Sequence, residues 1–562
     1  MPNITIHEKD ISAIARTDVT TNTIYVPGYA VTGPVDMPVY CETLDEFKQI
    51  FGTSPYVFEA NSNYPIEIKS DTIYALQGDY EKSYIYASEL VRNGLPIFFE
   101  RVSNTNLSTA QADLFTSESA KKYLKIQAKY PGRYGTAITY TLKKDKDNDI
   151  YTLTLKQGKE YKDKNKINIV FLDKEKSETI EFSLDKTSDK YFEAVISDII
   201  TFDSKGISTS DNLTEQGTAT SLEYDNKSPD FTVDNFYTKL YSEDSSIFDK
   251  IVDKATYNIK FITSGSYPVF DYVKETEKET KKETKPVLMQ YMLKCAATRG
   301  DCQAIIDYDI DDRLESVYTK LNAEPYISSL AVADSSDYKT ATDEYGQTEN
   351  TLKYGHIIGP WGTYINSVIS TDIKLPGSYA YLRALVSSTK SNPNWYAIAG
   401  VTRGLVPDLM QLEEIITGAI ADKVQTIKKN TCSIIPIMYI RDYGYCIWGN
   451  RTLHYQEYED LVASSFLNIR ILADDVKKTV YEAARALMFE TNSLQLWLNF
   501  KSKITPLLDK MITGNGLSDY TIRKEKTSKK ATLKVVITLY AIEAVENFDI
   551  TVEISDSVVE VS

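Results

Sequence analysis

The sequence predicts an α/β (α+β) protein of several domains, with mixed sheets and helices in its core domains, an inserted β-rich domain that protrudes, and extended arms at both ends. Strand and helix patterns alternate in residues 23–102 and again from residue 245, as expected of sheets layered with helices. Residues 103–244 carry short alternating runs separated by polar turns, which is typical of an all-β domain. At 562 residues, the chain is also too long for one hydrophobic core.

The composition is that of an ordinary globular protein, with 42% hydrophobic and 25% charged residues. The net charge of −16 argues against direct binding of nucleic acid, because such binding depends on clustered Lys and Arg. Tyrosine is frequent, at 41 residues against 19 phenylalanines. This excess favours partly hydrated interfaces, although the codon bias of a low-GC genome explains it equally well.

The chain lacks the patterns that direct a protein into or across a membrane. Residues 1–18 hold no basic stretch followed by an apolar core, so we expect no signal peptide. No apolar run approaches the roughly 20 residues that a membrane helix needs. The cysteines, at positions 41, 295, 302, 432 and 446, are odd in number and scattered, which favours a reducing compartment. We expect a soluble protein that stays inside a cell or leaves it by lysis.

Residues 23–102 and 245–385 are predicted to form one α/β middle domain around the inserted residues 103–244. Its first helix begins after Thr43, which forms a capping box with Glu46, and ends at the next glycine. The further elements expected in this domain are a helix over 81–94, a strand over 95–102, a helix over 287–300 and a strand over 301–309.

Residues 386–545 are predicted to form a C-terminal domain. A helix is expected over 408–430, another over 494–512, and a strand over 531–542. Between the two helices lies a third, whose apolar stripe follows the helical period. Its members are Leu472, Val476, Val480, Ala484, Leu487 and Met488.

Both ends of the chain are predicted to be linking arms that contain a strand. In residues 1–22, Ile4 and Ile6 alternate with polar residues. In residues 546–562, alternate positions place four apolar side chains on one face, namely Phe548, Ile550, Val552 and Ile554. A strand at a chain end can pair with its own fold or with a neighbour's, and we interpret both strands as links between copies. The chain is then a polymer subunit.

Residues that could carry catalysis or bind a metal are sparse. The histidines, at positions 7, 356 and 454, lie far apart without the context of a catalytic site, so we interpret them as structural. No two cysteines have the spacing of a zinc site. Neither a phosphate-binding loop nor a dinucleotide-binding fingerprint occurs. We expect no catalytic residue, no metal and no cofactor.

Arg451, in the segment IWGNRTL, is the polar residue of greatest interest. Two roles are open to it. Its guanidinium group can bind an acidic group of a partner, or it can bridge loop carbonyls and a carboxylate inside the protein. The internal role is favoured.

Several segments, taken together, resemble the contractile-tail sheath proteins of bacteriophages and phage-derived bacteriocin particles. The most specific are IWGNRTL at 447–453 and FETNSLQLW at 489–497. KIQAKYPGRYGTAITYTL at 125–142, TRGDCQAIIDYD at 298–309 and WYAIAGVTRG at 395–404 follow the order of that family. The opening segment, from IYVPGYAVTGPV at 24–35 to the F-G at 51–52, is similar too.

The resemblance implies a sheath of stacked six-fold rings that polymerises around a tail tube and contracts to drive the tube through a cell envelope. The partners would be further copies of the chain, the tube protein, the baseplate and the tail terminator, in a virion tail or bacteriocin particle assembled in the cytoplasm. Neighbours would donate strands from the arms to the C-terminal domain, which would line the tube. The contacts would be Ile4, Ile6, Phe548, Ile550, Val552 and Ile554.

Two further expectations follow from the resemblance. Residues 17–22 and 544–547 would act as hinges between the arms and the folded domains. Lys501, Lys503 and Lys510 on the last helix would face an acidic tube, although ordinary solvated helix charges explain them equally well. Two other functions stay open, a secreted or surface-layer polymer and an uncharacterised α/β enzyme.

Overall fold

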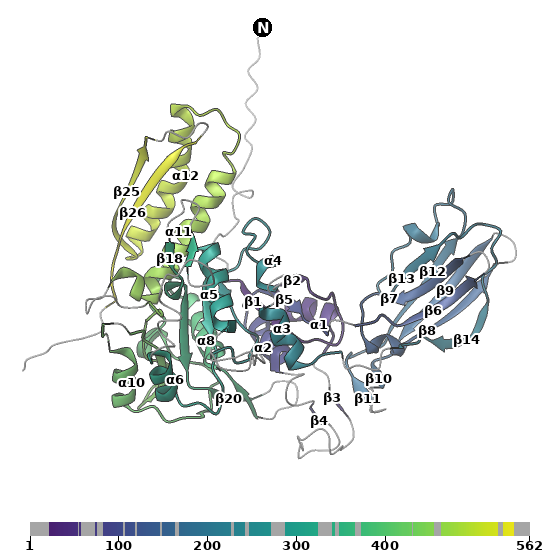
Figure 1. Ribbon diagram of the computed structural model, residues 1–562, viewed down its shortest axis with the longest axis horizontal. Helices are drawn as coiled ribbons and strands as arrows, with labels where there is room; N and C mark the ends of the chain where they lie inside the picture. Colours follow the sequence, from purple (N-terminus) through teal and green to yellow (C-terminus); the bar gives the residue numbers. More distant parts are fainter. Residues whose placement is uncertain are drawn as a thin grey trace, which may run out of the picture.

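The computed structural model describes residues 22–53, 56–57, 74–75, 82–104, 107–118, 121–145, 149–162, 168–225, 230–241, 247–270, 287–323, 340–342, 348–365, 372–426, 428–429, 431–454, 462–526 and 532–544. These residues form a central body, an inserted β-domain on one side of it, and a C-terminal lobe of two long helices and a hairpin (Figure 1). The expected class, α/β with mixed sheets in several domains, is confirmed.

The body is built on an eight-stranded sheet with the order β2-β5-β1-β15-β16-β19-β23-β24. Neighbouring strands from β5 to β23 run parallel, and the strands at the two edges run antiparallel. The strands are β1 Ile24–Gly28, β2 Pro38–Cys41, β5 Ile97–Arg101, β15 Phe261–Ile262, β16 Gln303–Ile306, β19 Gly355–Gly359, β23 Ile435–Ile440 and β24 Gly444–Ile447. The sheet therefore continues past residue 385, where the sequence predicted a domain boundary.

Helices cover both faces of this sheet, as its alternating side chains require. Ile24 and Val26 of β1 pack into the core beneath α1, α2 and α8, whereas Tyr25 packs into the core beneath α3, α4, α5 and α6. Because both faces are covered, the central strands are mostly apolar. The bounds are α1 Leu44–Phe51, α2 Lys82–Arg92, α3 Val233–Tyr241, α4 Ile247–Lys250, α5 Val287–Arg299, α6 Leu314–Leu321 and α8 Gly377–Thr389.

The first helix shows how local sequence sets an element. The Glu46 N–H donates to Thr43 Oγ1 at 3.3 Å, and the Thr43 N–H donates to Glu46 Oε2 at 3.2 Å. The helix ends at Gly52, whose φ is +79°. The predicted capping box is thus confirmed.

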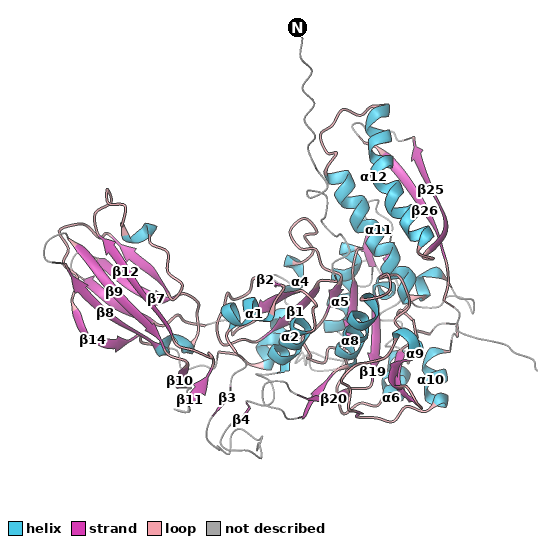
Figure 2. Ribbon diagram, turned by 180° about the vertical axis from the view of Figure 1, so that it is seen from behind, coloured by secondary structure: helices cyan, strands magenta, loops and turns pink. Residues whose placement is uncertain are grey.

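The inserted β-domain consists almost entirely of strands and stands apart from the helix-covered body (Figure 2). Its two sheets have the orders β12-β9-β8-β14 and β13-β7-β6, and they enclose an apolar core. The strands are β6 Gln111–Ser117, β7 Lys122–Ala128, β8 Ile138–Lys144, β9 Ile150–Gln157, β12 Lys176–Ser183, β13 Ile200–Lys205 and β14 Gln216–Ser221. Short 3₁₀ helices are η1 Arg133–Ala137 and η2 Phe192–Ala194.

Smaller elements complete the body. A four-stranded sheet, β10-β11-β3-β4, joins the inserted domain to the first part of the chain. Its strands are β3 Tyr56–Val57, β4 Tyr74–Ala75, β10 Glu160–Lys162 and β11 Asn168–Val170. The others are β17 Thr340–Thr342, β18 Thr348–Asn350, η3 Thr351–Tyr354, β20 Gly362–Ile365, β21 Asp372–Leu375, α9 Gly400–Arg403, β22 Gln411–Leu412, α10 Gly418–Gln425 and η4 Ala463–Ser465.

The helix predicted over 408–430 is mostly wrong. Among the described residues of this range, only Gly418–Gln425 is helical, and Gln411–Leu412 pairs with β20 as a strand. Asp408 has a φ of +64°, which a helix does not tolerate, and the Thr417 side chain caps the helix where it begins. Of the apolar residues before Thr417, Leu409 and Leu412 pack into the same core as β20, whereas Met410 and Ile415 are exposed.

The C-terminal lobe comprises α11 Leu467–Arg485, α12 Leu494–Thr513, β25 Leu517–Glu525 and β26 Lys534–Ala541. The helix predicted over 494–512 and the strand predicted over 531–542 are confirmed within one to three residues. The stripe predicted for α11 packs into the core of the lobe except at its end, where Met488 is 62% exposed. Leu487 and Met488 both follow the last residue of α11, and of the two only Leu487 packs against the core of the lobe.

Candidate functional site

The hairpin formed by β25 and β26 is the candidate site for assembly. The two strands pair antiparallel, with Tyr520 opposite Leu539 and Ile522 opposite Ile537. Among the described residues, neither strand pairs with a third one. A two-stranded sheet is at most marginally stable by itself, and each outer edge presents N–H and C=O groups that another strand can fill.

One face of the hairpin packs against α12. The Tyr520 hydroxyl donates to Asp509 Oδ1 of α12 at 2.6 Å, which ties β25 to the helix. The buried core of the lobe comes from the two helices, the loop of Trp395 and the first residue of β25, with members Trp395, Leu472, Val476, Phe500, Ile504, Leu508, Met511 and Leu517. The apolar strand residues that face it are only partly buried, namely Tyr520, Ile522, Val535, Ile537, Leu539 and Ala541.

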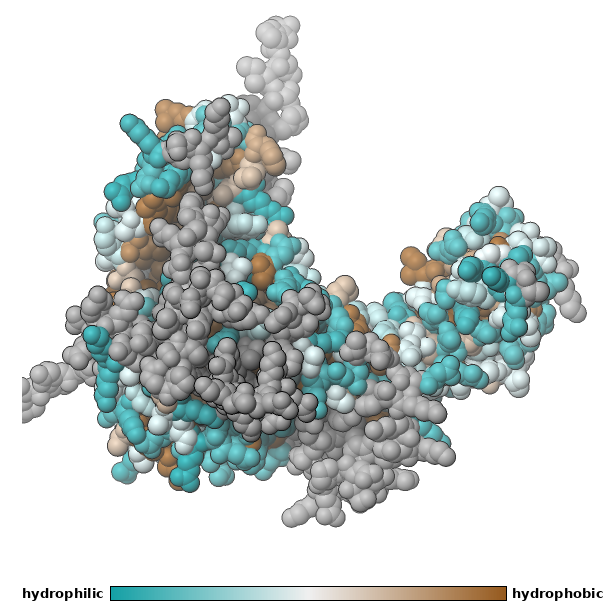
Figure 3. Space-filling model, viewed as in Figure 1, coloured by the Kyte–Doolittle hydropathy of each residue, from teal (hydrophilic) through white to brown (hydrophobic). Residues whose placement is uncertain are grey.

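This incomplete burial distinguishes the hairpin from the central sheet, whose strands β1, β16 and β19 are buried at every position. Further apolar surface follows at the end of β26, where Tyr540 and Ile542 are exposed. Figure 3 shows hydrophobic side chains gathered along the C-terminal lobe on the face in view. Within the part of the chain that the structure describes, the hairpin therefore offers both open edges and apolar area to an incoming strand.

The sequence predicted β26 but missed β25. Within Leu517–Glu525, Tyr520 and Ile522 alternate with Thr521 and Arg523, which is the two-residue period of a half-buried strand. That signal is short, and three charged residues near the end of the strand obscure it. The pairing with β26 makes the segment a strand.

The predicted strand contacts lie outside the described residues, namely Ile4, Ile6, Phe548, Ile550, Val552 and Ile554. Of the two predicted hinges, only Asn22 and Ala544 are described. Ala544 follows three residues after the end of β26, so the chain leaves the hairpin directly into the C-terminal segment.

The predicted tube-facing lysines, Lys501, Lys503 and Lys510, are all exposed on α12. They do not form one patch. Lys503 and Lys510 are seven residues apart and so lie roughly 20° apart around the helix axis. Lys501 precedes Lys503 by two residues, or about 200° of rotation, which places it on the other flank of the buried stripe.

Arg451 is inside the protein. Its side chain is 6% exposed, and its guanidinium carbon lies 4.9 Å from the centre of the Phe466 ring. The main chains of Arg451 and Phe466 also form an isolated antiparallel β-bridge. This position removes Arg451 from the surface that a partner could touch, while its bridging of loop carbonyls and a carboxylate stays a prediction.

Of the two described histidines, His356 is fully buried and His454 is partly buried. His356, on β19, is fully buried between the rings of Phe261 and Tyr381, and burial lowers the pKa of its imidazole to about 3. Burial likewise lowers the pKa of His454 to about 4, with Lys353 and Arg470 adding to the effect. Both rings are therefore neutral at physiological pH and serve as packed side chains.

The carboxyl ends of β1 and β15 meet where the order of the sheet reverses, which is where open α/β sheets bind ligands. Here the chain's own atoms fill that position. Ser83 Oγ accepts from the Tyr29 N–H at 2.9 Å, and a Cβ on Gly265 would lie 1.9 Å from the Pro27 oxygen.

Next to that position, Asp307 Oδ2 accepts from the Ser378 hydroxyl at 2.7 Å at the start of α8. Both residues are buried, and burial raises the pKa of the Asp307 carboxyl to about 7. In the part of the chain that the structure describes, no cluster of His, Cys, Asp and Glu could hold a metal ion. Among the same residues, no helix is long and apolar enough to cross a membrane.

No protein-family model and no curated protein matches the chain. A sheath tail protein from Listeria innocua has a similar solved structure, with a TM-score of 0.52 and 9% identity over 93% of this chain and 96% of that one. A sheath tail protein from Desulfitobacterium hafniense matches with a TM-score of 0.44 and 9% identity, over 96% of this chain and 100% of that one.

The contracted sheath of an extracellular contractile injection system, PVC, matches with a TM-score of 0.34 and 18% identity, over 46% of this chain. That match spans 65% of the PVC protein, which is less than two thirds of its length. The Listeria likeness covers nearly all of both chains with the highest of the three TM-scores. The chain therefore has the fold of a tail sheath protein.

Proposed function

We propose that the chain is the structural subunit of a contractile tail sheath, which polymerises helically around a tail tube and contracts to drive the tube through a cell envelope. The observation that supports this most is the likeness to the Listeria sheath tail protein over 93% of this chain. The hairpin β25–β26, with its open edges and partly buried apolar face, supports it independently. The role is structural and not enzymatic.

Strands donated by neighbouring copies would fill the edges of the hairpin. An eight-residue strand such as 548–555 spans about 26 Å and forms roughly four main-chain hydrogen bonds per edge, each contributing about 0.5–1.5 kcal/mol net. Burial of Phe548, Ile550, Val552 and Ile554 adds to this, while ordering of the arm opposes it. Each link is therefore modest, and many links stabilise a polymer.

A contact of this kind is head-to-tail, because one copy gives a strand and another receives it. Such contacts produce a helix of subunits when they do not close on themselves. The proposed assembly is a stack of six-fold rings that also contacts a tube protein, a baseplate and a tail terminator. It belongs to a virion tail or a bacteriocin-like particle that is assembled in the host cytoplasm.

Contraction would move subunits as nearly rigid bodies while the donated strands stay paired, with residues 17–22 and 544–547 as hinges. The energy would come from better contacts in the contracted lattice, so no nucleotide is required. Lys503 and Lys510, which share one side of α12, are the proposed contacts to the tube.

Negative-stain electron microscopy of the purified full-length chain tests this proposal. Striated hollow tubes that form without any other protein are the expected result. A protein that remains monomeric at high concentration, over a range of salt and pH, contradicts it. A flat two-dimensional lattice instead of tubes would favour a surface-layer polymer.

A further inference from the structure

The helix α11, residues Leu467–Arg485, belongs to two hydrophobic cores at once. Leu467 and Ile471, in its first turns, pack into the core on one face of the central sheet. Leu472 and Val476 pack into the core of the C-terminal lobe. Because the helix is continuous, the way its first turns pack against the body determines the orientation of the rest of the C-terminal lobe.

The face of α11 that meets the body is charged as well as apolar. Lys260 Nζ, next to the start of β15, lies 2.9 Å from Asp475 Oδ2, and the two side chains are 3% and 2% exposed. The Gln303 side-chain amide, at the start of β16, donates to Asp474 Oδ2 at 2.6 Å. Two adjacent residues of α11 are thus held by two neighbouring strands.

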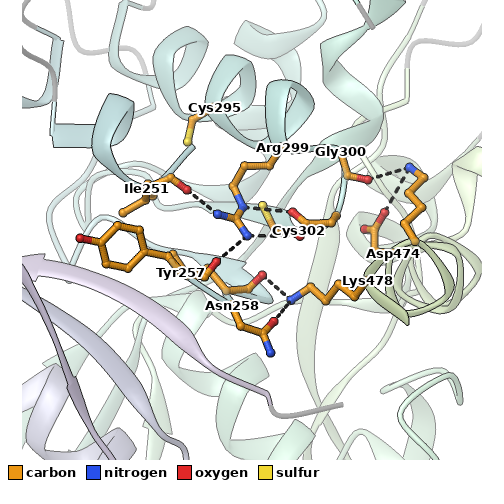
Figure 4. Close-up of polar contacts among 12 residues, drawn as sticks. Ile251, Tyr257, Asn258, Cys295, Arg299, Gly300, Cys302, Asp474 and Lys478 are labelled. Atoms are coloured by element: carbon orange, nitrogen blue, oxygen red, sulfur yellow. Dashed lines mark hydrogen bonds and ion pairs between the residues drawn. The ribbon is translucent and has the colours of Figure 1, made fainter. Parts of the chain in front are cut away.

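One turn further along α11, Lys478 reaches the two residues that precede Lys260. Its ammonium group donates to the Ile259 oxygen at 2.5 Å and to Asn258 Oδ1 at 2.9 Å, and its side chain is buried (Figure 4). The neighbouring Lys477 donates to the Gly300 oxygen at 2.7 Å. The contacts of α11 therefore come from two separate segments of the body, residues 258–260 and 300–303, at two heights along the helix.

Arg299 fixes the segment that receives Lys478. It binds both oxygens of Asp301, at 3.0 and 3.2 Å, and its remaining N–H groups donate to the oxygens of Ile251 and Tyr257 (Figure 4). The guanidinium group is fully buried. Arg299, a second buried charge, thereby holds the main chain at Tyr257, two residues before the Ile259 oxygen that accepts from Lys478.

Such a cluster is better suited to fixing an orientation than to adding stability. Removing charges from water is costly, and well-packed apolar residues often stabilise a protein as much as a buried ion pair. Each contact here, however, needs one position of the helix. A rotation of α11 by one residue, about 100°, would carry Asp475 away from Lys260 and leave both charges buried without their counter-ions.

We propose that Asp474, Asp475 and Lys478 are positioning residues that fix the angle between the body and the strand-receiving hairpin. In an assembled sheath, that angle sets the direction in which each neighbour is held, and with it the helical twist. The statement about the angle concerns the single chain. The statement about the twist rests on the proposed function.

The angle is tested on the single chain by the distance between two spin labels, one on α12 at Ser502→Cys and one on α1 at Gln49→Cys. Both positions are exposed, and the five native cysteines are buried, so the labels attach selectively. The double variant K260M/D475L and the single variant K478M should broaden or shift the distance distribution while circular dichroism stays unchanged. If either variant fails to fold, the milder D475N takes its place. It should broaden or shift the distance distribution to a smaller extent.

The matched control is K156M/E175L, which removes an exposed ion pair of 2.8 Å in the inserted β-domain, away from α11 and the hairpin. It should leave the distribution as in the parent chain. Unchanged distributions in K260M/D475L, K478M and D475N would overturn the proposal about the angle.

The twist is measured by helical reconstruction of assembled tubes. K478M tubes should differ in twist from parent tubes, and K156M/E175L tubes should not. If K478M broadens the label distances and its tubes keep the parent twist, the statement about the twist is wrong. If the parent chain forms no tubes, the proposed function fails, whereas the label distances still decide the statement about the angle.

Discussion

Trp395, from the loop after α8, donates its indole N–H to the main-chain oxygen of Gly514 at the end of α12, 3.0 Å away. The body thus places one large side chain inside the core of the C-terminal lobe. A Cβ on Gly516 would lie 2.6 Å from the indole ring. The ring therefore fits only because position 516 is a glycine, which has no side chain. Trp395 and α11 are two separate attachments of the same lobe.

Replacing Trp395 by alanine should therefore loosen the lobe. Truncation of a buried tryptophan costs about 3–5 kcal/mol. The free energy of unfolding of α12, measured by hydrogen exchange in increasing urea, should fall by that amount. The control is Trp448→Ala, which truncates a tryptophan that is 38% exposed and should cost much less. Equal losses in the two variants would contradict the role assigned to Trp395.

Deleting residues 547–562 should leave a folded chain that no longer forms long tubes, because the strand that links copies is gone. Electron microscopy measures the tubes, and circular dichroism measures the fold. A finer pair of variants keeps the chain length constant. Val552→Pro lacks the N–H that strand pairing needs, and Val552→Thr retains it, so only the proline variant should fail to polymerise. Normal tubes from the shortened chain would rule out donated strands.

Assembly should slow hydrogen exchange in β25 and β26. In the single chain, each strand has one edge without a described partner strand, so the amides on that edge should exchange rapidly. Strands added from neighbours would protect those amides. Amides of β1, whose strand is paired on both sides, serve as the internal reference. Equal exchange of the hairpin before and after assembly would show that the edges stay empty.

Reversing the charge of Lys503 and Lys510 together should weaken attachment to a tube without preventing self-assembly of the sheath. The two residues share one side of α12, so one acidic surface can meet both. Lys501→Glu, on the opposite flank, is the matched control. Co-sedimentation with the tube protein measures the effect. If K501E weakens attachment as much as the double variant, the contact does not lie on that side.

Asp307 should make stability fall as the pH rises between about 4 and 7. Burial raises the pKa of its carboxyl to about 7 from an ordinary value of 3.8. Within that window, the folded chain keeps the proton and the unfolded chain releases it, so stability declines by about 1.4 kcal/mol per pH unit. Asp307→Asn stays neutral, and its stability relative to the parent chain should rise across this window.

Titration of His356 changes the stability in the opposite direction to titration of Asp307. The informative quantity is therefore the difference in stability between the parent chain and D307N at each pH. Its pKa is lowered to about 3, and its contribution to stability is therefore lost as the pH falls from about 6.5. Asp45→Asn, at an exposed position of α1, provides the control for D307N. Denaturant melts at several pH values give both curves. A constant difference between D307N and the parent chain would mean that Asp307 does not titrate in this range.

Local patterns alone predicted the elements whose cause is local. The capping box of Thr43 and Glu46 depends on residues three apart, and the apolar stripe of α11 on spacings of three and four. The alternation in 531–542 predicted β26 in the same way. In each case the deciding interaction lies within one or two turns of helix or a few residues of strand.

Only the tertiary structure decided which strands share a sheet and which charges are buried. Nothing near Ile435 indicates that β23 belongs to the sheet of β1, some four hundred residues earlier in the chain. The run of two acidic and two basic residues in α11 is typical of a solvated helix face, yet Asp474, Asp475 and Lys478 are buried. Their partners, Gln303, Lys260 and Ile259, are distant in sequence, and a charge can be buried only where folding brings such partners together.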